Sequence, residues 1–411
     1  MYVTTNLTLE STQSVEARHH DRLRLRLDFL DGIRGLAALY VVLYHAITYI
    51  GYSTTPRTAL SAPMQFVASI LDYGPYAVPV FIVLSGFCLM LPLAQAETTY
   101  IPGGVLAYLR RRAWRILPSY YAALFLFLGL IVLFPVLQTP HNTMWDTKIP
   151  VTIGGIISHL LLIHNLRPYW VYKIDGPMWS VATEWQIYFL FPTLLLPILR
   201  RSNIVVTIGL ALIVGTLPHF LLPPSINLDD VHPWFIGLFA MGMAGAITVF
   251  SNNATIIRYR RKLRQGWLCI AITIPLICAL ALAKEWMDWH PYISETWAGI
   301  AIMCWLVQYG SNIRDGVRRS WSHRLLESRA LLMLGTFSYS IYLIHNPIQG
   351  LINLELLKVN MSADTRLAII VGVATPFAIL CSYVFYLLVE RKAMRMKARA
   401  ASSKQTASVN S

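Results

Sequence analysis

Long runs of apolar residues, separated by short polar and basic segments, make up most of the chain between residues 30 and 389. A membrane-spanning helix needs about 20 mostly apolar residues, and ten runs approach that length. They are 30–50, 78–95, 115–137, 181–199, 203–222, 232–250, 267–283, 292–309, 331–353 and 367–389. The pattern predicts an all-α membrane protein, built as a bundle of about ten transmembrane helices.

An eleventh apolar run, 151–166, is shorter and contains His159 and His164. If this run does not span, 26 of the 34 Lys and Arg residues fall on one side of the membrane. These residues lie in 18–26, 110–115, 200–201, 258–264, 314–329 and 391–404. Because basic residues concentrate in cytoplasmic segments, we expect ten spans with both termini cytoplasmic. The 151–166 run is then an interfacial or re-entrant helix.

Composition supports a membrane protein and argues against other classes. Apolar residues make up 56% of the 411 residues and charged residues 13%, whereas soluble domains contain roughly 25% charged residues. The formal net charge of +14 comes from short clusters between apolar runs, so it predicts membrane topology and no nucleic-acid partner. The five cysteines lie inside apolar runs without metal-ligand spacing, so we expect no metal site.

Three regions follow from this pattern. Residues 1–28 are polar and basic, and we expect a basic cytoplasmic tail. Residues 29–390 form the multi-pass membrane domain. Residues 391–411 begin basic and become rich in Ser and Ala, which predicts a second basic, disordered cytoplasmic tail.

Polar residues inside the predicted spans are the candidates for function, because burying them in hydrocarbon is costly. Arg34 and His45 in the first span are eleven residues apart. They therefore share one helix face at a separation of roughly 16 Å along the axis. The alternative is structural: the arginine extends to the interface, and the histidine hydrogen-bonds a neighbouring helix.

Three other segments add candidates. Arg110, Arg111, Arg112 and Arg115 precede the third span, where they fit either the topology rule or the binding of a phosphorylated cofactor. Glu184 lies near the start of the fourth span. There its negative charge either interacts favourably with the helix dipole or serves to orient a histidine. Ser338, Tyr342 and His345 share one face of the ninth span, which alone predicts a polar packing seam or a site.

Together these segments resemble the acyltransferase 3 family of integral membrane proteins. Arg34 and His45 match its Arg-x10-His motif, and residues 80–86 resemble its Phe-Phe-x-x-Ser-Gly segment, with Val80 replacing the first aromatic residue. Residues 112–118 match its Arg-x-x-Arg-Ile-x-Pro segment, and Trp179-Ser180 with Glu184 and residues 338–345 follow the later motifs. The resemblance covers about residues 27–390.

The resemblance implies a membrane-embedded O-acyltransferase that uses acyl-CoA, with acetyl as the expected acyl group, and holds no permanently bound cofactor. The acceptor would be a hydroxyl of a carbohydrate, a lipid-linked sugar or a small metabolite, and the expected location is the plasma membrane. Arg112 and Arg115 would bind the phosphates of the donor, and Arg34 a phosphate or the thioester carbonyl. His45 would act as general base or as nucleophile.

Glu184 and His345 would then steer His45 or the acceptor. A proton-coupled multi-pass transporter is the alternative, because transporters also place Arg, His and Glu inside the membrane. Against it, the chain shows no internal repeat and no paired broken segments in equivalent halves. A non-catalytic scaffold leaves the alignment of Arg34 with His45 unexplained.

Overall fold

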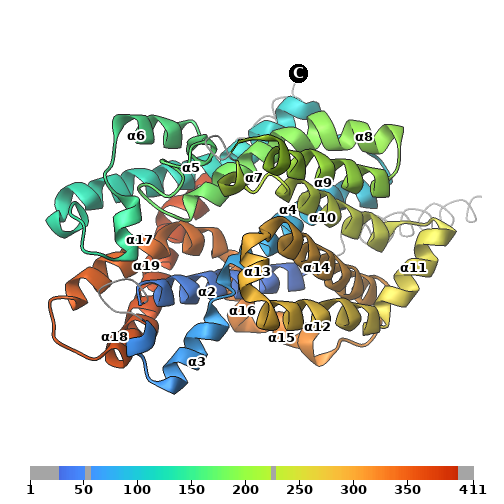
Figure 1. The fold of residues 1–411 in the computed structure, drawn as a ribbon. Coiled ribbons are helices and arrows are strands. Elements are labelled where there is room, and N and C mark those ends of the chain that lie inside the picture. The colour runs from blue at the N-terminus through green and yellow to red at the C-terminus, as the bar shows by residue number, and fades with distance from the viewer. Residues whose placement is uncertain (1–26, 51–56, 224–227, 397–411) are drawn as a thin grey trace, which may run out of the picture.

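The computed structural model describes residues 27–50, 57–223 and 228–396, and these residues fold into helices without strands. The long helices are α2 (Phe29–Thr48), α4 (Ala77–Gln95), α5 (Gly104–Leu133), α9 (Ile204–Leu221), α10 (Phe235–Phe250), α12 (Trp267–Leu282), α14 (Pro291–Arg314) and α17 (Ser338–Leu356). Figure 1 shows them as one bundle. The predicted tails lie mostly outside the described residues.

Two more long helices contain π-helical turns. Helix α7 (Met178–Leu190) continues through η6 (Phe191–Leu195) into α8 (Leu196–Arg201). The last helix runs through α18 (Ala363–Ile369), η9 (Ile370–Ala374), α19 (Thr375–Phe385) and η10 (Tyr386–Glu390). Shorter helices connect the long ones: α3 (Ala62–Leu71), α6 (Ile153–Leu160), α11 (Ala254–Arg264), α13 (Lys284–Trp289), α15 (Trp321–Leu326) and α16 (Arg329–Thr336).

Seven segments of the described chain are long and apolar enough to cross a membrane. They are Phe29–Thr48, Ala62–Gln95, Gly104–Leu133, Met178–Arg201, Ile204–Leu221, Asp229–Phe250 and Ala363–Met396, and α11 with α12, bent by 62°, makes an eighth if counted as one span. Helices α14 and α17 lie at the other two predicted runs and carry more polar residues. The count of ten spans and the cytoplasmic termini therefore stay predictions.

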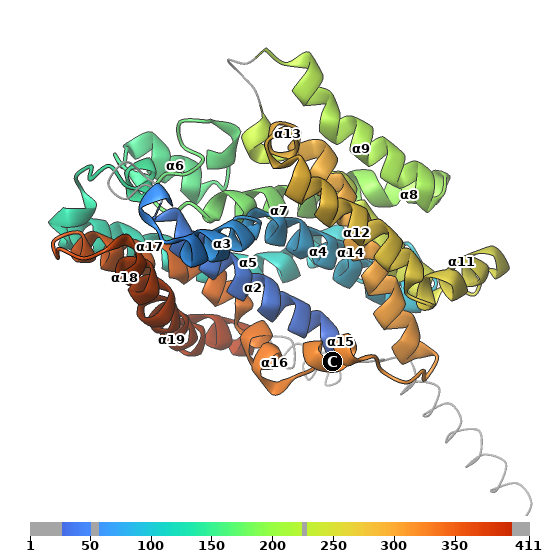
Figure 2. The ribbon, with the colours of Figure 1, turned by 60° about the horizontal axis from the view of Figure 1, so that its bottom comes forward.

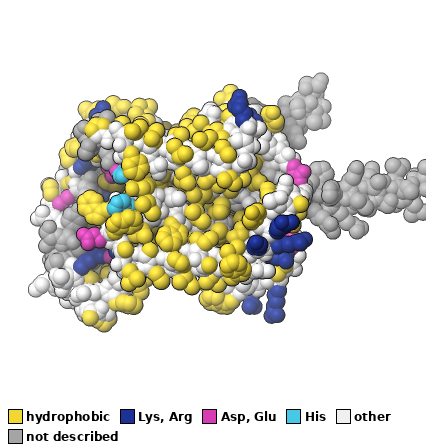
Figure 3. Space-filling model, turned by 45° about the vertical axis from the view of Figure 1, so that its right-hand side comes forward, with side chains coloured by type: hydrophobic (Ala, Val, Ile, Leu, Met, Phe, Trp, Pro, Cys, Tyr) yellow, Lys and Arg dark blue, Asp and Glu magenta, His cyan; other side chains and the backbone are white. Residues whose placement is uncertain are grey.

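The surface of the molecule is that expected of a membrane-spanning bundle. Figure 3 shows a broad band of hydrophobic side chains across the middle of the molecule, and charged side chains gather towards its two ends.

The eleventh apolar run, 151–166, contains α6. This helix has eight residues, so it is about 12 Å long and too short to span the roughly 30 Å hydrocarbon core.

Two boundaries differ from the prediction. Arg110–Arg115 was expected in a connection before a span starting near residue 115, but α5 begins at Gly104, so the arginines lie on its early turns. The 331–353 run was expected as one helix, but it breaks at Phe337 into α16 and α17. Both differences have one cause: helices here extend beyond their apolar stretches or stop inside them, because tertiary packing rather than hydropathy sets their ends.

Close backbone contacts bring the central helices together. A Cβ atom on Gly86 of α4 would lie 2.0 Å from the Phe239 carbonyl oxygen, and one on Gly242 of α10 would lie 2.0 Å from that of Val83. Each helix therefore uses a glycine where the other backbone approaches, as small residues do in membrane bundles. Figure 2 shows α2 running through the bundle, where it packs on α4, α16 and α17.

Candidate active site

A cavity of about 110 Å³ lies among α2, α4, α5, α7 and α17. We call it the arginine cavity, because Arg34, Arg112 and Arg115 line it. Its other polar lining residues are Ser85, Ser180, Glu184, Tyr188, Ser338, Tyr339 and Tyr342. The structure therefore brings together Arg34, Arg112, Arg115, Glu184, Ser338 and Tyr342 from four helices, whereas His45 and His345 do not line this cavity.

The arginines of this cavity are only partly neutralised. Arg34 donates to Asp31 Oδ1 at 2.7 Å and to Cys88 Sγ at 3.0 Å. Arg112 has its guanidinium 5.9 Å from the centre of the Tyr188 ring, and its buried Nε has no hydrogen-bond partner. Within the described residues, neither Arg112 nor Arg115 forms an ion pair with a carboxylate. Since Glu184 is the single carboxylate lining the cavity, positive charge is in excess there.

Glu184 lies in the wall of this cavity. Its carboxylate accepts hydrogen bonds from Ser85 Oγ and, at 2.6 Å, from the Tyr188 hydroxyl. One turn before Glu184 on α7, Ser180 Oγ lies 2.5 Å from the Tyr342 hydroxyl of α17. No hydrogen bond of Glu184 to a histidine occurs in the described part of the chain. No direct contact therefore supports the prediction from the sequence that Glu184 steers His45.

His45 and His345 meet instead. Nδ1 of His45 lies 3.2 Å from Nε2 of His345, and their ring centres are 4.9 Å apart. His345 is completely buried, whereas His45 is half-buried. These two residues are 300 positions apart in the chain, and the packing of α17 on α2 puts them in contact.

The backbone fixes the proton position on both rings. Nδ1 of His45 is 2.9 Å from the Val41 carbonyl oxygen, and Nδ1 of His345 is 2.8 Å from that of Ile341. Because a carbonyl oxygen can only accept, Nδ1 carries the proton in each ring. The single Nδ1–H of His45 is then shared between the Val41 carbonyl oxygen and Nε2 of neutral His345, and Nε2 of His45 keeps a free lone pair. No hydrogen bond to that atom is present among the described residues.

A buried polar network lies against the turn of α17 that carries His345. Asn346 Nδ2 donates to Asp175 Oδ1 at 3.1 Å, and the Tyr49 hydroxyl donates to Asn346 Oδ1 at 2.9 Å. Lys148 and Asp175 precede α7 and are both buried. Burial lowers the pKa of the Lys148 ammonium and raises the pKa of the Asp175 carboxyl, and the opposite charge of the other residue limits each shift.

A second cavity, of about 520 Å³, lies beyond His45 along α2. Tyr44 and Thr48, which flank His45, line it. We call it the mixed-charge cavity, because the ionisable side chains around it are Arg57, Asp72, His232, Lys284, Asp288 and Glu295. Neither histidine is among the residues that line the two cavities, but near neighbours of both are: Tyr342, one turn before His345, lines the first cavity, and Tyr44 lines the second.

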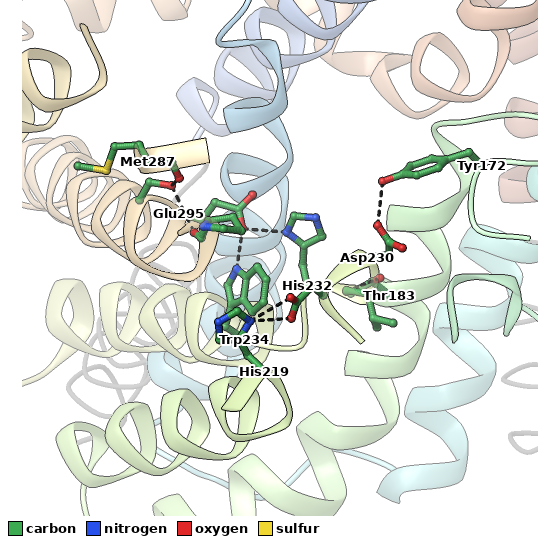
Figure 4. Close-up of polar contacts among 12 residues, drawn as sticks. Tyr172, Thr183, His219, Asp230, His232, Trp234, Met287 and Glu295 are labelled. Atoms are coloured by element: carbon green, nitrogen blue, oxygen red, sulfur yellow. Dashed lines mark hydrogen bonds and ion pairs between the residues drawn. The ribbon is translucent and has the colours of Figure 1, made fainter. Parts of the chain in front are cut away.

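Sequence reasoning missed the mixed-charge cavity. It expected His345 to steer His45 or the acceptor, and the structure brings these two rings into contact. Part of the cavity wall comes from α2 and α14, and the rest comes from η1 (Arg57–Ala59), η2 (Gly74–Tyr76), α13 and His232, which follows η8 (Asp229–Val231) and is labelled in Figure 4. These connecting segments carry no periodic pattern. The one available signal was the clustering of carboxylates and aromatic residues in 284–295.

Comparison with known proteins gives a family match and two relatives. A family model described as "Acyltransferase domain" matches residues 27–387. The peptidoglycan O-acetyltransferase OatA of Listeria monocytogenes is 21% identical over 334 residues, which cover 78% of this chain and 49% of the relative. The acyltransferase MdmB of Streptomyces mycarofaciens is 28% identical over 174 residues, 41% of this chain and 39% of the relative. The chain thus aligns with at most about half of either relative, and no solved structure matches it.

Proposed function

We propose that this chain, which belongs to the acyltransferase 3 family, transfers an acyl group from acyl-CoA to a hydroxyl of an acceptor. The single observation that carries the proposal is the contact of His45 with His345, which lie on α2 and α17, two helices that also line the arginine cavity. Acetyl is the proposed acyl group, because the relative OatA is named an O-acetyltransferase. The proposed location is the plasma membrane, and both tails are proposed to be cytoplasmic.

The arginine cavity is the proposed donor site. Arg112 and Arg115 lie one turn apart on α5, and guanidinium groups bind phosphate oxygens through paired hydrogen bonds. Arg115 is exposed and Arg112 half-buried, so the phosphates would lie at the mouth. A cavity of about 110 Å³ admits the arm of the donor rather than its nucleotide. Arg34 would then bind a phosphate, because it lies roughly 16 Å along α2 from His45, too far to polarise a thioester carbonyl that reacts there.

The long arm of a coenzyme A thioester explains why charge and base are separated. Arg34 and His45 lie roughly 16 Å apart along α2, so a donor held at the arginines must reach towards the histidines. An acyl-CoA does so, because its phosphates and its thioester lie at opposite ends of a flexible arm. A small phosphorylated donor would leave His45 without a reacting partner.

His45 is the proposed general base. The acceptor hydroxyl gives its proton to His45 Nε2 while its oxygen bonds to the thioester carbonyl carbon. The tetrahedral adduct then expels the coenzyme thiolate by breaking the carbon–sulfur bond, and the imidazolium returns the proton to sulfur. A direct acyl-imidazole on Nε2 is the variant of this step in which His45 is the nucleophile.

His345 is the proposed positioning residue in this step. Its Nε2 accepts from the Nδ1–H of His45, which keeps the lone pair of His45 on Nε2 and stabilises the imidazolium that forms. Glu184, with Ser85 and Tyr188, is proposed to shape the donor cavity instead of orienting His45 directly.

A label-transfer assay tests the proposal. Membranes containing the protein receive acetyl-CoA labelled in the acetyl group, together with a cell extract as acceptor pool, and both free thiol and label in products are measured. General base catalysis contributes about 10²–10⁴-fold, so His45→Ala should lose at least about a hundredfold in turnover. Wild-type turnover by folded, membrane-inserted His45→Ala would contradict the mechanism. Accumulation of an unmodified solute in vesicles, without thiol release, would favour transport.

A further inference from the structure

Helix α11 carries five basic residues, and two of them hold it against the bundle. Arg260 is buried, and its Nη1 donates to the carbonyl oxygens of Val249 and Ser251 at 3.0 Å each. Arg264 pairs at 2.8 Å with Asp315, which follows the end of α14. These contacts fix α11 on α10 and α14, so the fold sets the direction in which its remaining basic residues project.

The other three basic residues of α11, Arg258, Arg261 and Lys262, are exposed. At about 100° per residue, Arg258 and Lys262 project from the side opposite Arg260, and Arg261 lies beside them. Within the described residues, none of the three forms an ion pair with a carboxylate. We call them the cationic face of α11. Exposed cations without a partner attract anions, so this face is suited to a negatively charged ligand.

The next helix, α12, presents an exposed apolar stripe. Its residues, each about half exposed and sharing one side of the helix at spacings of three and four, are Trp267, Ile270, Ile274 and Ile277. From Trp267 to Ile277 the stripe is about 15 Å long, which is half of the roughly 30 Å hydrocarbon core of a bilayer. It therefore has the depth of one leaflet, as the acyl chains of a phospholipid do.

A hydrogen bond places the start of this stripe beside the cationic face. Trp267 Nε1 donates to Gln265 Oε1 at 3.1 Å, and Gln265 is exposed one turn after Arg261. Gly266, with φ of 81°, lies between the two helices, which are bent by 62° at this point. Figure 2 shows α11 turned outwards from the bundle at the end of α12. The corner therefore joins a cationic surface to an apolar one, with a tryptophan at the boundary, as is common at membrane interfaces.

We infer that the corner between α11 and α12 binds an anionic phospholipid. Its headgroup phosphate would lie on the cationic face, and an acyl chain would lie along the stripe of α12. None of these residues lines either cavity, so the site is separate from the proposed acyl transfer.

Charge decides between the possible ligands. A zwitterionic phospholipid fits the stripe, but it has no net charge to neutralise the cations. A soluble phosphate compound meets the cations without covering the stripe. An anionic phospholipid does both, and each basic residue near an anionic membrane surface contributes about fivefold to binding. Three such residues on one face therefore favour the anionic lipid by at least about tenfold.

Two sets of substitutions test the site. The glutamine variant combines Arg258→Gln, Arg261→Gln and Lys262→Gln, which removes the cationic face. Because the three side chains are exposed, the fold should be retained. The lysine variant combines Arg258→Lys and Arg261→Lys, which keeps the charge and should keep the lipid.

The matched control removes three exposed arginines elsewhere. Arg318→Gln, Arg324→Gln and Arg329→Gln together take the same charge from a basic segment that is predicted to lie on the same side of the membrane. These residues lie in the connection before α15, in α15 and in α16, so they share no single helix face.

The full chain is purified in a neutral detergent and titrated with phosphatidylglycerol or with phosphatidylcholine of the same acyl chains. Native mass spectrometry measures the affinity for the first bound lipid. We expect wild-type protein to bind phosphatidylglycerol at least about tenfold more tightly than phosphatidylcholine. The glutamine variant should reduce this preference to about twofold, whereas the lysine variant and the control should keep it. Soluble glycerol phosphate at the same concentration should not displace the bound lipid, because it leaves the stripe uncovered.

Equal binding of the two lipids by wild-type protein would overturn the inference. An equal loss of preference in the glutamine variant and in the control would do the same, because net charge rather than the cationic face would then govern binding. Displacement of the lipid by glycerol phosphate would show a site for soluble phosphate compounds instead. These results do not depend on label transfer, so the proposed function is tested separately.

Discussion

The two cavities near the histidine pair contain similar side chains but treat charge in opposite ways. In the arginine cavity, Arg112 and Arg115 form no ion pair among the described residues, although Arg115 acts electrostatically on Glu390, and Glu184 is bound to hydroxyl groups. In the mixed-charge cavity, Arg57 and Lys284 each pair with an aspartate of the same wall, and Glu295 adds a third carboxylate. The first arrangement leaves positive charge for a ligand to neutralise, whereas the second leaves none.

Under the proposed function, this contrast would direct the donor to one of the two cavities. Moving a charge out of water is costly unless it meets an opposite charge, so unpaired cations favour a polyanionic ligand. The mixed-charge cavity, with three carboxylates to two cations, disfavours the same ligand. A coenzyme A thioester would therefore bind at the arginine cavity and not at the mixed-charge cavity.

Reversing the charge of the arginine cavity should have the largest effect. Arg112→Glu combined with Arg115→Glu replaces two phosphate partners by two repelling charges. Each charge-assisted hydrogen bond is worth about tenfold, so the KM for acetyl-CoA should rise by about a hundredfold or more. Steady-state kinetics in membranes, with protein level and insertion checked, provide the measurement.

Arg110→Glu combined with Arg111→Glu is the matched control, since these residues lie on the same early turns of α5 and do not line the cavity. The control should retain a KM for acetyl-CoA within a few-fold of wild type, because it acts only through long-range charge. Equal effects of both pairs would mean that the arginines act through topology alone, and the contrast between the cavities would lose its functional meaning.

Substitution of His345 should have an intermediate effect. In His345→Ala the Nδ1–H of His45 keeps the Val41 carbonyl oxygen and loses the side-chain acceptor that stabilises the imidazolium, so turnover should fall by about 10–100-fold while both KM values change little. His345→Gln keeps a side-chain acceptor and should recover part of the rate. The split between kcat and KM, measured for both variants, separates positioning of His45 from a loss of fold. A rise of the acetyl-CoA KM with unchanged kcat would instead place His345 in donor binding.

The sequence predicted much of the fold, because hydropathy and the spacing of basic residues are local properties. Helices occur at all ten predicted runs, and the spacing of Arg34 and His45 on α2 follows from helix geometry alone. The break at Phe337 was missed, because α16 is held by close packing on α2: a Cβ on Gly335 would lie 2.0 Å from the Asp31 carbonyl oxygen. Such long-range contacts leave no periodic signal.

The site was predicted in its residue types but not in its pairing. Arg34, Glu184 and His345 were singled out because burying polar residues inside spans is costly. Arg112 and Arg115 were singled out because they belong to a cluster of arginines that precedes the third predicted span. Which of them touch depends on helix crossings, so Glu184 proved to contact Ser85 and Tyr188, whereas His345 contacts His45. Their catalytic and binding roles stay predictions.

Salt should produce the smallest effect and the finest separation of the two substrates. Unpaired surface cations lose attraction for a polyanion as the Debye length shortens, so the KM for acetyl-CoA should rise by about threefold between about 0.05 and about 0.5 M salt. A neutral acceptor feels little long-range field, and its KM should stay within about 1.5-fold over the same range. Kinetic measurements at several salt concentrations on one preparation give the salt dependence of both KM values. Arg115→Gln should weaken the salt dependence of the KM for acetyl-CoA alone, because Arg115 is the exposed cation at the mouth of the arginine cavity. Equal salt dependence of the two KM values would show that net protein charge, and not the local pairing of charges, governs both substrates.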